Sequence, residues 1–299
     1  MSGAAAEENL KDRAVGCLYG QAIGDALGAR YEFLPQQEAS KQVKKDKRWF
    51  TGFLPIFGGG GFKVLPGQVT DDTELAMCLC RSLLERKTFD KESVIKNYLF
   101  WFSSENRFGL GQTTKIAFQE ELMEAAKADC RLTNPNAIAQ DAVACYVCII
   151  KMLITEDGDA DKAYQQALQV CQTETVRNIL TAAEQKPTPV YVELLKSEID
   201  VDGPCMGYCG VALQSAVYEL LHSNSLHESL VRVMRRGGDT DTTGCITGAV
   251  LGAKLGAKAI PKEWKDTVRT ARPQRIKENP FVDLSDLEAA AVDLLLCRV

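Results

Sequence analysis

Histidine is nearly absent from this chain, since only His222 and His227 occur among 299 residues. Many enzymes use histidine as a general base beside a serine or cysteine nucleophile, or as a ligand of catalytic zinc. Both histidines lie in one polar stretch that connects two helical patterns. The sequence therefore argues against a Ser-His-Asp triad, a Cys-His pair and a histidine-ligated zinc site.

Several features of other protein classes are missing as well. Only 25% of the residues are charged and the net charge is −5, so we expect no nucleic-acid partner. The one basic run, residues 41–48, is interpreted as a solvated face or a loop. The longest apolar run is broken by Lys151, well short of the about 20 residues that span a membrane, and the first residues lack a signal-peptide pattern. We therefore expect no membrane partner.

The eleven cysteines do not form the pattern of a disulfide framework or a zinc site. Many of them lie inside apolar helical segments, where reduced thiols are usually buried. The Cys145-x-x-Cys148 pair belongs to such a segment and has no second pair at zinc spacing. A reducing compartment fits this use of cysteine, so we expect a cytoplasmic protein, with the nucleus as an alternative. We also expect a monomer.

Two acidic stretches stand at the beginnings of predicted helices. In residues 235–244, Asp239 and Asp241 alternate with Thr240 and Thr242 ahead of a run of small apolar residues. One aspartate is enough to cap a helix, whereas two with neighbouring hydroxyls form a cluster of hard oxygens of the type that Mg²⁺, Mn²⁺ or Ca²⁺ prefers. Metal binding and plain capping both remain open for this stretch alone.

The second acidic stretch is residues 66–74, where Thr70, Asp71 and Asp72 precede an apolar segment of helical spacing. If the two helix beginnings met, four carboxylates would lie close together and repel one another. Two divalent cations would cancel that repulsion and create a site suited to oriented hydrolysis. The alternative is that the two beginnings lie apart and each only caps its own helix.

Glycine recurs at every fourth position in two segments, at residues 16, 20, 24 and 28 and at residues 244, 248, 252 and 256. Each interior glycine costs a helix about 0.5–1 kcal/mol relative to alanine, so four in register need a compensating contact. We predict that these two helices cross closely at the centre of the molecule. The crossing would bring Asp25 and Glu32, which share a helical face if that helix persists to residue 32, near the second acidic cluster.

The chain is predicted to be all-α, a compact orthogonal multi-helix globule with a central glycine-striped helix pair, in one domain spanning residues 1–299 with residues 1–8 disordered. The four glycines at 58–61 predict a loop, either a mobile lid or a plain surface loop. The Gly-x-Gly-x-Thr-Thr turn at 109–114 and the glycine-rich helix entry at Tyr208 are candidate pocket walls. Helical patterns cover residues 9–31, 72–86, 91–104, 113–128, 136–154, 160–172, 175–184, 190–196, 207–222, 226–235, 242–257, 261–271 and 284–297.

These motifs, in this order, resemble the ADP-ribosylglycohydrolase family and most closely its dinitrogenase-reductase-activating, ADP-ribosylarginine hydrolase-like branch. The matching segments are residues 20–33, 66–76, 207–208 with the helix that follows, and 237–244. The resemblance implies an all-α hydrolase that uses two divalent cations, Mg²⁺ or Mn²⁺, to cleave the bond between the ribose of ADP-ribose and a modified side chain. Its partner would be an ADP-ribosylated protein, with arginine as the first expectation, or a small ADP-ribosyl compound.

By motif position, the resemblance also implies residue roles. Glu32 would assist catalysis next to the metal site, with Asp25 supporting the site from behind. Asp71, Gly207 and Tyr208 would contact substrate. The implied metal ligands are Glu32, Thr70, Asp71, Asp72, Asp239, Asp241 and Thr242.

The chain departs from the family pattern in the segment that shapes the nucleotide pocket. Relatives carry an Asn-Gly-x-x-Met-Arg segment after the Gly-x-Gly-x-Thr-Thr turn, whereas residues 119–131 here read as uninterrupted helix. The intact acidic residues favour a hydrolase, because unpaired carboxylates would destabilise a fold that had no use for cations. The missing segment favours the alternative, a catalytically silent binding or structural protein like the crystallins of this family.

Overall fold

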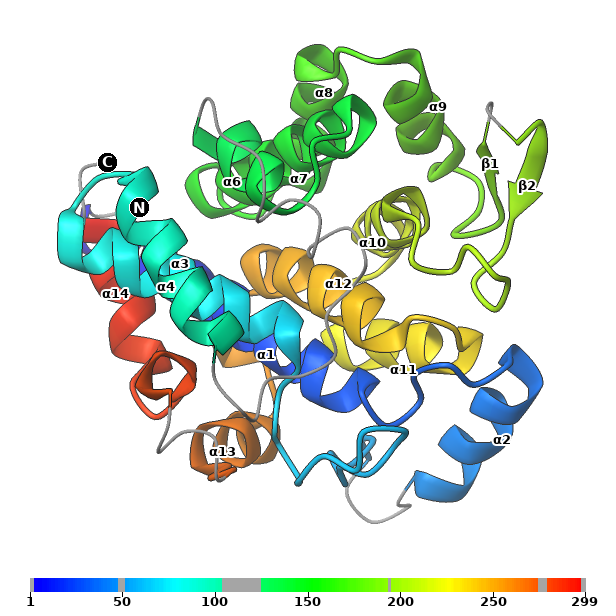
Figure 1. Ribbon diagram of the computed structural model, residues 1–299, viewed down its shortest axis with the longest axis horizontal. Helices are drawn as coiled ribbons and strands as arrows, with labels where there is room; N and C mark the ends of the chain where they lie inside the picture. The colour runs from blue at the N-terminus through cyan, green and yellow to red at the C-terminus, as the bar shows by residue number, and fades with distance from the viewer. Residues whose placement is uncertain (1–2, 48–51, 104–124, 193–194, 274–278, 297–299) are drawn as a thin grey trace.

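Helices account for nearly all the regular structure in the described part of the chain. The computed structural model describes residues 3–47, 52–103, 125–192, 195–273 and 279–296 (Figure 1). The helices are α1 (Gly3–Gly28), α2 (Gln36–Asp46), α3 (Asp71–Arg86), α4 (Lys91–Ser103), α6 (Ala125–Thr133), α7 (Ala137–Thr155), α8 (Ala160–Val170), α9 (Glu174–Ala182), α10 (Cys209–His222), α11 (Leu226–Arg236), α12 (Thr240–Leu255), α13 (Lys262–Thr270) and α14 (Leu287–Leu296). One antiparallel pair of strands, β1 (Val190–Val192) and β2 (Ser197–Ile199), and the short 3-10 helices η1 (Ala257–Ala259) and η3 (Pro280–Val282) complete the regular structure of the described residues. The all-α prediction is confirmed.

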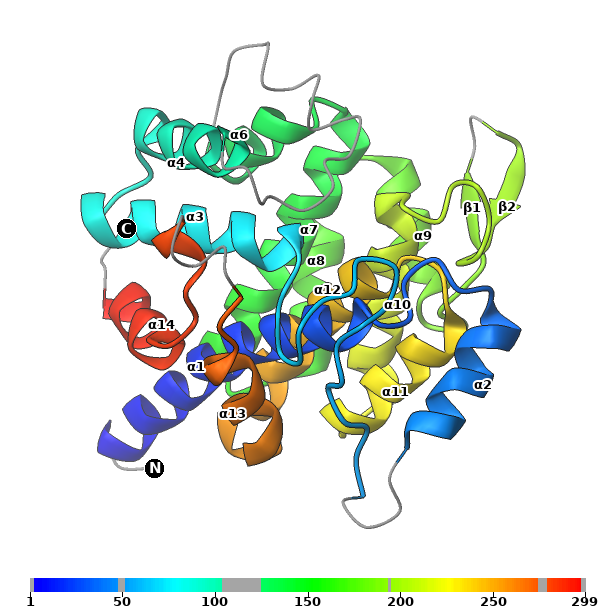
Figure 2. The ribbon, with the colours of Figure 1, turned by 60° about the horizontal axis from the view of Figure 1, so that its bottom comes forward.

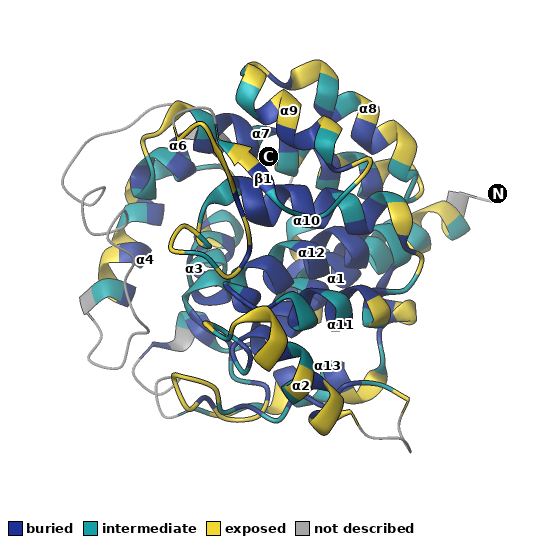
Figure 3. Ribbon diagram, turned by 90° about the vertical axis from the view of Figure 1, so that its right-hand side faces the viewer, coloured by how far each residue is buried: buried dark blue, intermediate teal, exposed yellow. Residues whose placement is uncertain are grey.

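The glycine-striped helices α1 and α12 lie against each other at the centre of the molecule, with the other helices around them (Figure 1). A Cβ at Gly20 would lie 2.0 Å from the carbonyl oxygen of Gly248, and one at Gly24 would lie 1.9 Å from that of Gly244. Since no side chain fits at such distances, the two backbones touch directly. The predicted central helix pair is therefore confirmed, and Figure 3 shows both helices mostly buried.

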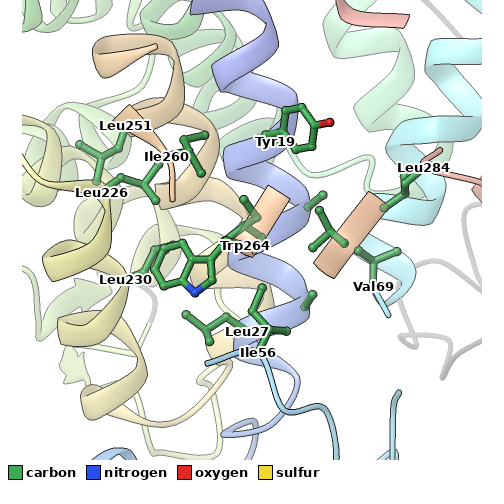
Figure 4. Close-up of a cluster of buried hydrophobic side chains, with 14 of the residues drawn as sticks. Tyr19, Leu27, Ile56, Val69, Leu226, Leu230, Leu251, Ile260, Trp264 and Leu284 are labelled. Atoms are coloured by element: carbon green, nitrogen blue, oxygen red, sulfur yellow. The ribbon is translucent and has the colours of Figure 1, made fainter. Parts of the chain in front are cut away.

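Two large apolar clusters enclose this helix pair on different sides. In the first, Trp264 of α13 lies near Leu226 and Leu230 of α11 (Figure 4), and its indole nitrogen donates to the carbonyl of Leu54 at 2.7 Å. The second cluster is built by α7, α8, α9 and α10 against α12. Packing on both sides holds α1 and α12 in register, which determines where their ends meet.

Helix α7 is the one described helix whose length and composition would allow it to cross a membrane. Core helices of folded domains have the same composition. In this structure α7 packs against α8, α10 and α12, and Cys145, Ile149 and Leu153 are fully buried there. The Cys145-x-x-Cys148 pair thus belongs to a core helix as expected, and all described cysteines are free thiols.

Two predictions about secondary structure are wrong. Residues 3–8, expected to be disordered, form the first turns of α1, where Glu8 pairs with Lys258 at 2.7 Å. Residues 190–196, expected to be a helix, contain strand β1, which pairs with β2. Val190, Tyr191 and Val192 suit a pleated strand, because Val190 points into the core and Tyr191 points outward.

The basic run at residues 41–48 is interpreted from the sequence as a solvated face or a loop, but its residues 41–46 belong to α2, a helix that the sequence does not predict. Helix α2 has few apolar residues, since only Ala39 and Val43 are buried along with Asp46. A bidentate ion pair between Asp46 and Arg30 anchors the end of α2, at 2.6 and 3.1 Å. Because this partner lies outside the helix, local periodicity could not predict α2.

The close approach of α1 and α12 predicts a strong effect of a single methyl group. Gly20→Ala places its Cβ on a backbone carbonyl that no rotamer change can relieve, so we expect the protein to lose about 1–3 kcal/mol of unfolding free energy despite the better helix propensity of alanine. Gly203→Ala is the matched control, because its Cβ would meet nothing closer than 3.7 Å. Denaturant unfolding of both variants measures the difference, and equal stability would contradict the direct backbone contact.

Candidate functional site

The end of α1 meets the beginning of α12, and this junction positions Glu32. A Cβ at Gly28 would lie 2.2 Å from the carbonyl oxygen of Thr240, whose hydroxyl donates to the Gly28 carbonyl at 2.8 Å. Two backbone hydrogen bonds follow, from Phe33 N to Gly238 O at 2.8 Å and from Gly238 N to Leu34 O at 2.9 Å. They hold the segment that contains Glu32 beside the start of α12.

The condition for Glu32 to share a helical face with Asp25 is not met, because α1 ends at Gly28 and does not persist to residue 32. Residues 29–33 form a turn instead, in which the amide of Glu32 donates to the carbonyl of Gly28 at 3.1 Å. The helix ends where Gly28 contacts Thr240 at the start of α12. Glu32 nevertheless reaches the acidic cluster, carried there by the turn rather than by the helix.

The start of α3 is attached to α1 through Asp25, which is fully buried. Asp25 accepts hydrogen bonds from the Thr70 amide at 2.9 Å, the Thr70 hydroxyl at 2.8 Å and the Thr73 amide at 3.0 Å. It therefore caps α3 from another helix, satisfying amides that a helix beginning leaves without partners. This agrees with a supporting role for Asp25 rather than a catalytic one.

The beginnings of α3 and α12 meet. Of the two alternatives for the acidic stretches, the structure therefore has the one in which they lie together, and not the one in which each only caps its own helix. The hydroxyl of Thr242, in the first turn of α12, donates to Asp72 Oδ2, in the first turn of α3, at 3.2 Å. Around this contact, Glu32, Asp239 and Asp241 each offer one carboxylate oxygen within 4.8 Å of the others. The structure thus brings together carboxylates from three segments that are far apart in the sequence.

The electrostatics of this cluster are unfavourable for a protein without cations. Burial and then the charge of Asp239 raise the pKa of Glu32 to about 8, and burial raises the pKa of Asp25 to about 6. Burial followed by neighbouring carboxylates raises the pKa values of Asp72 and Asp241 well above normal. Among the described residues no lysine or arginine forms an ion pair with these groups, so each resists ionisation.

The residues present fit divalent cations. Glu32 Oε2 is buried and has no hydrogen-bond partner in the described part of the chain, an arrangement that costs free energy unless something else binds it. The neighbouring donors are carboxylate and hydroxyl oxygens, which suit hard cations. A positive charge here would lower the raised pKa values and allow the carboxylates to ionise together.

The other predicted site residues lie around this centre. Thr70 is fully buried, and Asp71 is half-buried at the start of α3, outside the group of three close carboxylates. Gly207 lies at the edge of the cluster, because a Cβ there would be 3.5 Å from Asp239 Oδ2. The ring of Tyr208 is half-buried over Gly210, and its hydroxyl is buried without a described partner.

Two predictions concern segments near this site. The glycines at 58–61 are not a free loop, since Arg30 donates to the Gly58 carbonyl at 2.8 Å and a Cβ at Gly60 would lie 2.0 Å from Ala29 O. The glycine loop therefore packs on the segment that leads to Glu32, and a lid motion stays a prediction. The Gly-x-Gly-x-Thr-Thr turn and the first half of residues 119–131 lie outside the described residues, while α6 covers the second half.

Sequence reasoning missed an exposed aromatic pair beside Glu32. Phe33 is 53% exposed, Phe62 of the glycine loop is 42% exposed, and their rings meet edge to face with centroids 6.1 Å apart. Phe33 also has a φ of 64°, which is unusual for a bulky residue and is held by its hydrogen bond to Gly238. The only sequence signal was the position of Phe33 directly after Glu32. The pair offers a face on which a planar ligand group could stack.

A structural role explains a second group of possible metal ligands better than metal binding does. This group is Asp141, Cys145 and Cys171. Asp141 accepts from the Gln172 amide and from the amide and hydroxyl of Thr173, at 2.7–3.1 Å. Burial would raise the pKa of Asp141, but these donors outweigh it and hold that pKa below its usual value. Asp141 thus orders the chain that enters α9 and has little capacity left for a cation.

Fold and site together define an all-α protein with a partly buried carboxylate cluster suited to divalent cations. The chain belongs to the ADP-ribosylglycohydrolase family, whose model matches residues 6–120 and 116–295. Members of this family are hydrolases that remove ADP-ribose from proteins and use divalent metals, so the chain is an ADP-ribosylglycohydrolase-type enzyme. The family resemblance drawn from the sequence is confirmed.

Individual relatives agree with the branch that the motifs indicated. The chain is 27% identical to an ADP-ribosylarginine hydrolase Tri1 of Serratia proteamaculans, over 92% of this chain and 80% of that protein. It is 24% identical to the ADP-ribosyl-[dinitrogen reductase] glycohydrolase of Rhodospirillum rubrum, over 94% of this chain and 99% of that protein. A solved ADP-ribosylglycohydrolase-related protein complex has the same fold, with a TM-score of 0.71 at 22% identity, covering 98% of this chain and all of that chain.

Cation binding at this site can be tested without any substrate. We expect Mg²⁺ or Mn²⁺, at about 100 times its dissociation constant, to raise the melting temperature by roughly 5 °C, because it binds only the folded cluster. Asp241→Asn removes one carboxylate of the cluster, so it should abolish this shift while the cation-free protein remains folded. Asp161→Asn, which changes an exposed aspartate of α8, is the control and should keep the shift. A full shift in the Asp241 variant would contradict a ligand role.

Proposed function

We propose that this protein removes ADP-ribose from arginine side chains of modified proteins, with two divalent cations, Mg²⁺ or Mn²⁺, as cofactors. The observation that carries this proposal is the meeting of two acidic helix beginnings around Glu32, Asp239 and Asp241. Arginine as the modified residue is supported by the Serratia proteamaculans relative, an ADP-ribosylarginine hydrolase that the chain resembles over most of its length. The exposed ring of Phe33 adds support, because an aromatic face attracts a guanidinium group.

The residues that would hold the cations are the carboxylates and hydroxyls of the two helix beginnings, with Glu32 at their edge. When bound, the cations would supply charge that orients the ribose hydroxyls and a water molecule. These ligands are Glu32, Thr70, Asp71, Asp72, Asp239, Asp241 and Thr242.

The chain's own residues would perform the remaining steps. Glu32 Oε2, which has no described partner, can give a proton to the leaving nitrogen or take one from the attacking water. Asp25 holds the start of α3 in place through its three hydrogen bonds and so keeps Asp71 and Asp72 aligned. Gly207 leaves space beside Asp239 for the sugar, and Tyr208 at the start of α10 would border it.

Hydrolysis of defined peptides tests this proposal. With Mg²⁺ or Mn²⁺ present, we expect the protein to release ADP-ribose from an arginine-linked peptide and to act more slowly on a serine-linked one. Glu32→Gln keeps the size of the side chain but cannot exchange a proton in the same way, so kcat should fall by about 100-fold or more. Glu38→Gln, an exposed glutamate of α2, is the matched control. If the unmodified protein releases no ADP-ribose from the arginine-linked peptide, the proposed activity is wrong.

A further inference from the structure

A groove with a positive lining runs between α2 and α11, which lie side by side (Figures 1 and 2). Its volume is about 490 Å³. Helix α2 contributes Lys41 and Lys44, and the last turn of α11 contributes Arg235 and Arg236; the rest of the lining is polar. In a chain with a net charge of −5, this is a local reversal of sign.

Three of these four positively charged side chains have no partner among the residues that the structure describes. Lys41 and Lys44 are exposed and lie one helical turn apart, on one face of α2. Arg235 forms no described ion pair or hydrogen bond, and its Nε is buried without an acceptor. Arg236 differs, because it is paired with the buried Glu219 and donates to Ser215 at 2.7 Å.

Two residues that line the groove are close in sequence to residues of the candidate active site. Gln36 in its lining follows Glu32 by four residues, and Arg235 precedes Asp239 by four residues. Since consecutive Cα atoms are about 3.8 Å apart, neither lining residue can lie more than about 15 Å from the backbone of the corresponding site residue. The paired backbone hydrogen bonds between Phe33–Leu34 and Gly238 fix the two connecting segments against each other.

We propose that this groove binds an acidic peptide segment next to the modified residue of the protein substrate. The proposal rests on the proposed function, which supplies a protein substrate held at the adjacent site. Exposed lysines bind a single small anion weakly because water and salt screen them, whereas a run of acidic side chains can engage Lys41, Lys44 and Arg235 together. The lining contains no aromatic or apolar side chain, so it lacks the stacking surface that single-stranded nucleic acids use.

Charge reversal on α2 separates docking from catalysis. The substrates are two ADP-ribosylarginine peptides that differ only in carrying glutamates or glutamines beside the modified arginine. We expect the Lys41→Glu/Lys44→Glu variant to raise KM for the acidic peptide by about tenfold, with kcat unchanged and the neutral peptide affected less than about twofold. Lys45→Glu makes the same charge change on an exposed residue of the same helix outside the groove, so it should match the unmodified protein.

A direct binding measurement tests the groove independently of the hydrolase activity. Fluorescence anisotropy of a labelled, unmodified acidic peptide should show binding to the full protein that weakens with added salt and is lost in the double variant, whether or not any peptide is hydrolysed. The Lys41→Gln/Lys44→Gln variant should also bind the acidic peptide more weakly than the unmodified protein, but by a smaller factor than the charge-reversal variant. Equal KM values for the two peptides in the unmodified protein, or an acidic peptide that binds the double variant normally, would overturn the docking groove while leaving the hydrolase intact. Tighter binding of an oligonucleotide of equal charge, lost in the double variant, would overturn it in favour of nucleic acid.

Discussion

Direct backbone contact between α1 and α12 is the constraint on which the rest of the structure depends. Carbonyl oxygens of one helix occupy the positions that side chains would take on the other, all along the stripe from Gly16 to Gly28. Two helices that touch in this way cannot slide or rotate without a clash, because packed interiors leave no free volume. Their ends are therefore fixed relative to each other, and Glu32 and Asp241 arrive at one place because of it.

The carboxylate cluster is held together at an energetic cost that the fold alone does not offset. Glu32, Asp72 and Asp241 all have raised pKa values, caused first by burial and then by neighbouring acids. Asp25 is spared part of this cost, since Thr70 and Thr73 donate three hydrogen bonds to it. A bound cation would favour the ionised carboxylates, so cation binding and the stability of the fold would be coupled at this site.

Much of this arrangement could be predicted from the sequence, because its signals are local or periodic. Glycine at every fourth residue indicated the helix pair, and two helix beginnings rich in acids and hydroxyls indicated the site. Helix α2 escaped prediction because Arg30, outside the helix, neutralises its buried Asp46. The sequence did not indicate the end of α1 before Glu32, because that end coincides with the contact between Gly28 and Thr240, which lies far away along the chain. No local sequence pattern reveals that Arg235 and the lysines of the groove lack partners, because such pairing depends on contacts between distant segments.

The proposed function requires that the beginnings of α3 and α12 share divalent cations. A crystal of the protein grown with Mn²⁺ tests this most directly, because the anomalous signal of manganese locates the ions independently of any assumption about activity. The account predicts two peaks about 3.5–4 Å apart, between Asp72 on one side and Asp239 and Asp241 on the other. A map with no peak there, or with manganese only on surface carboxylates elsewhere, would contradict it.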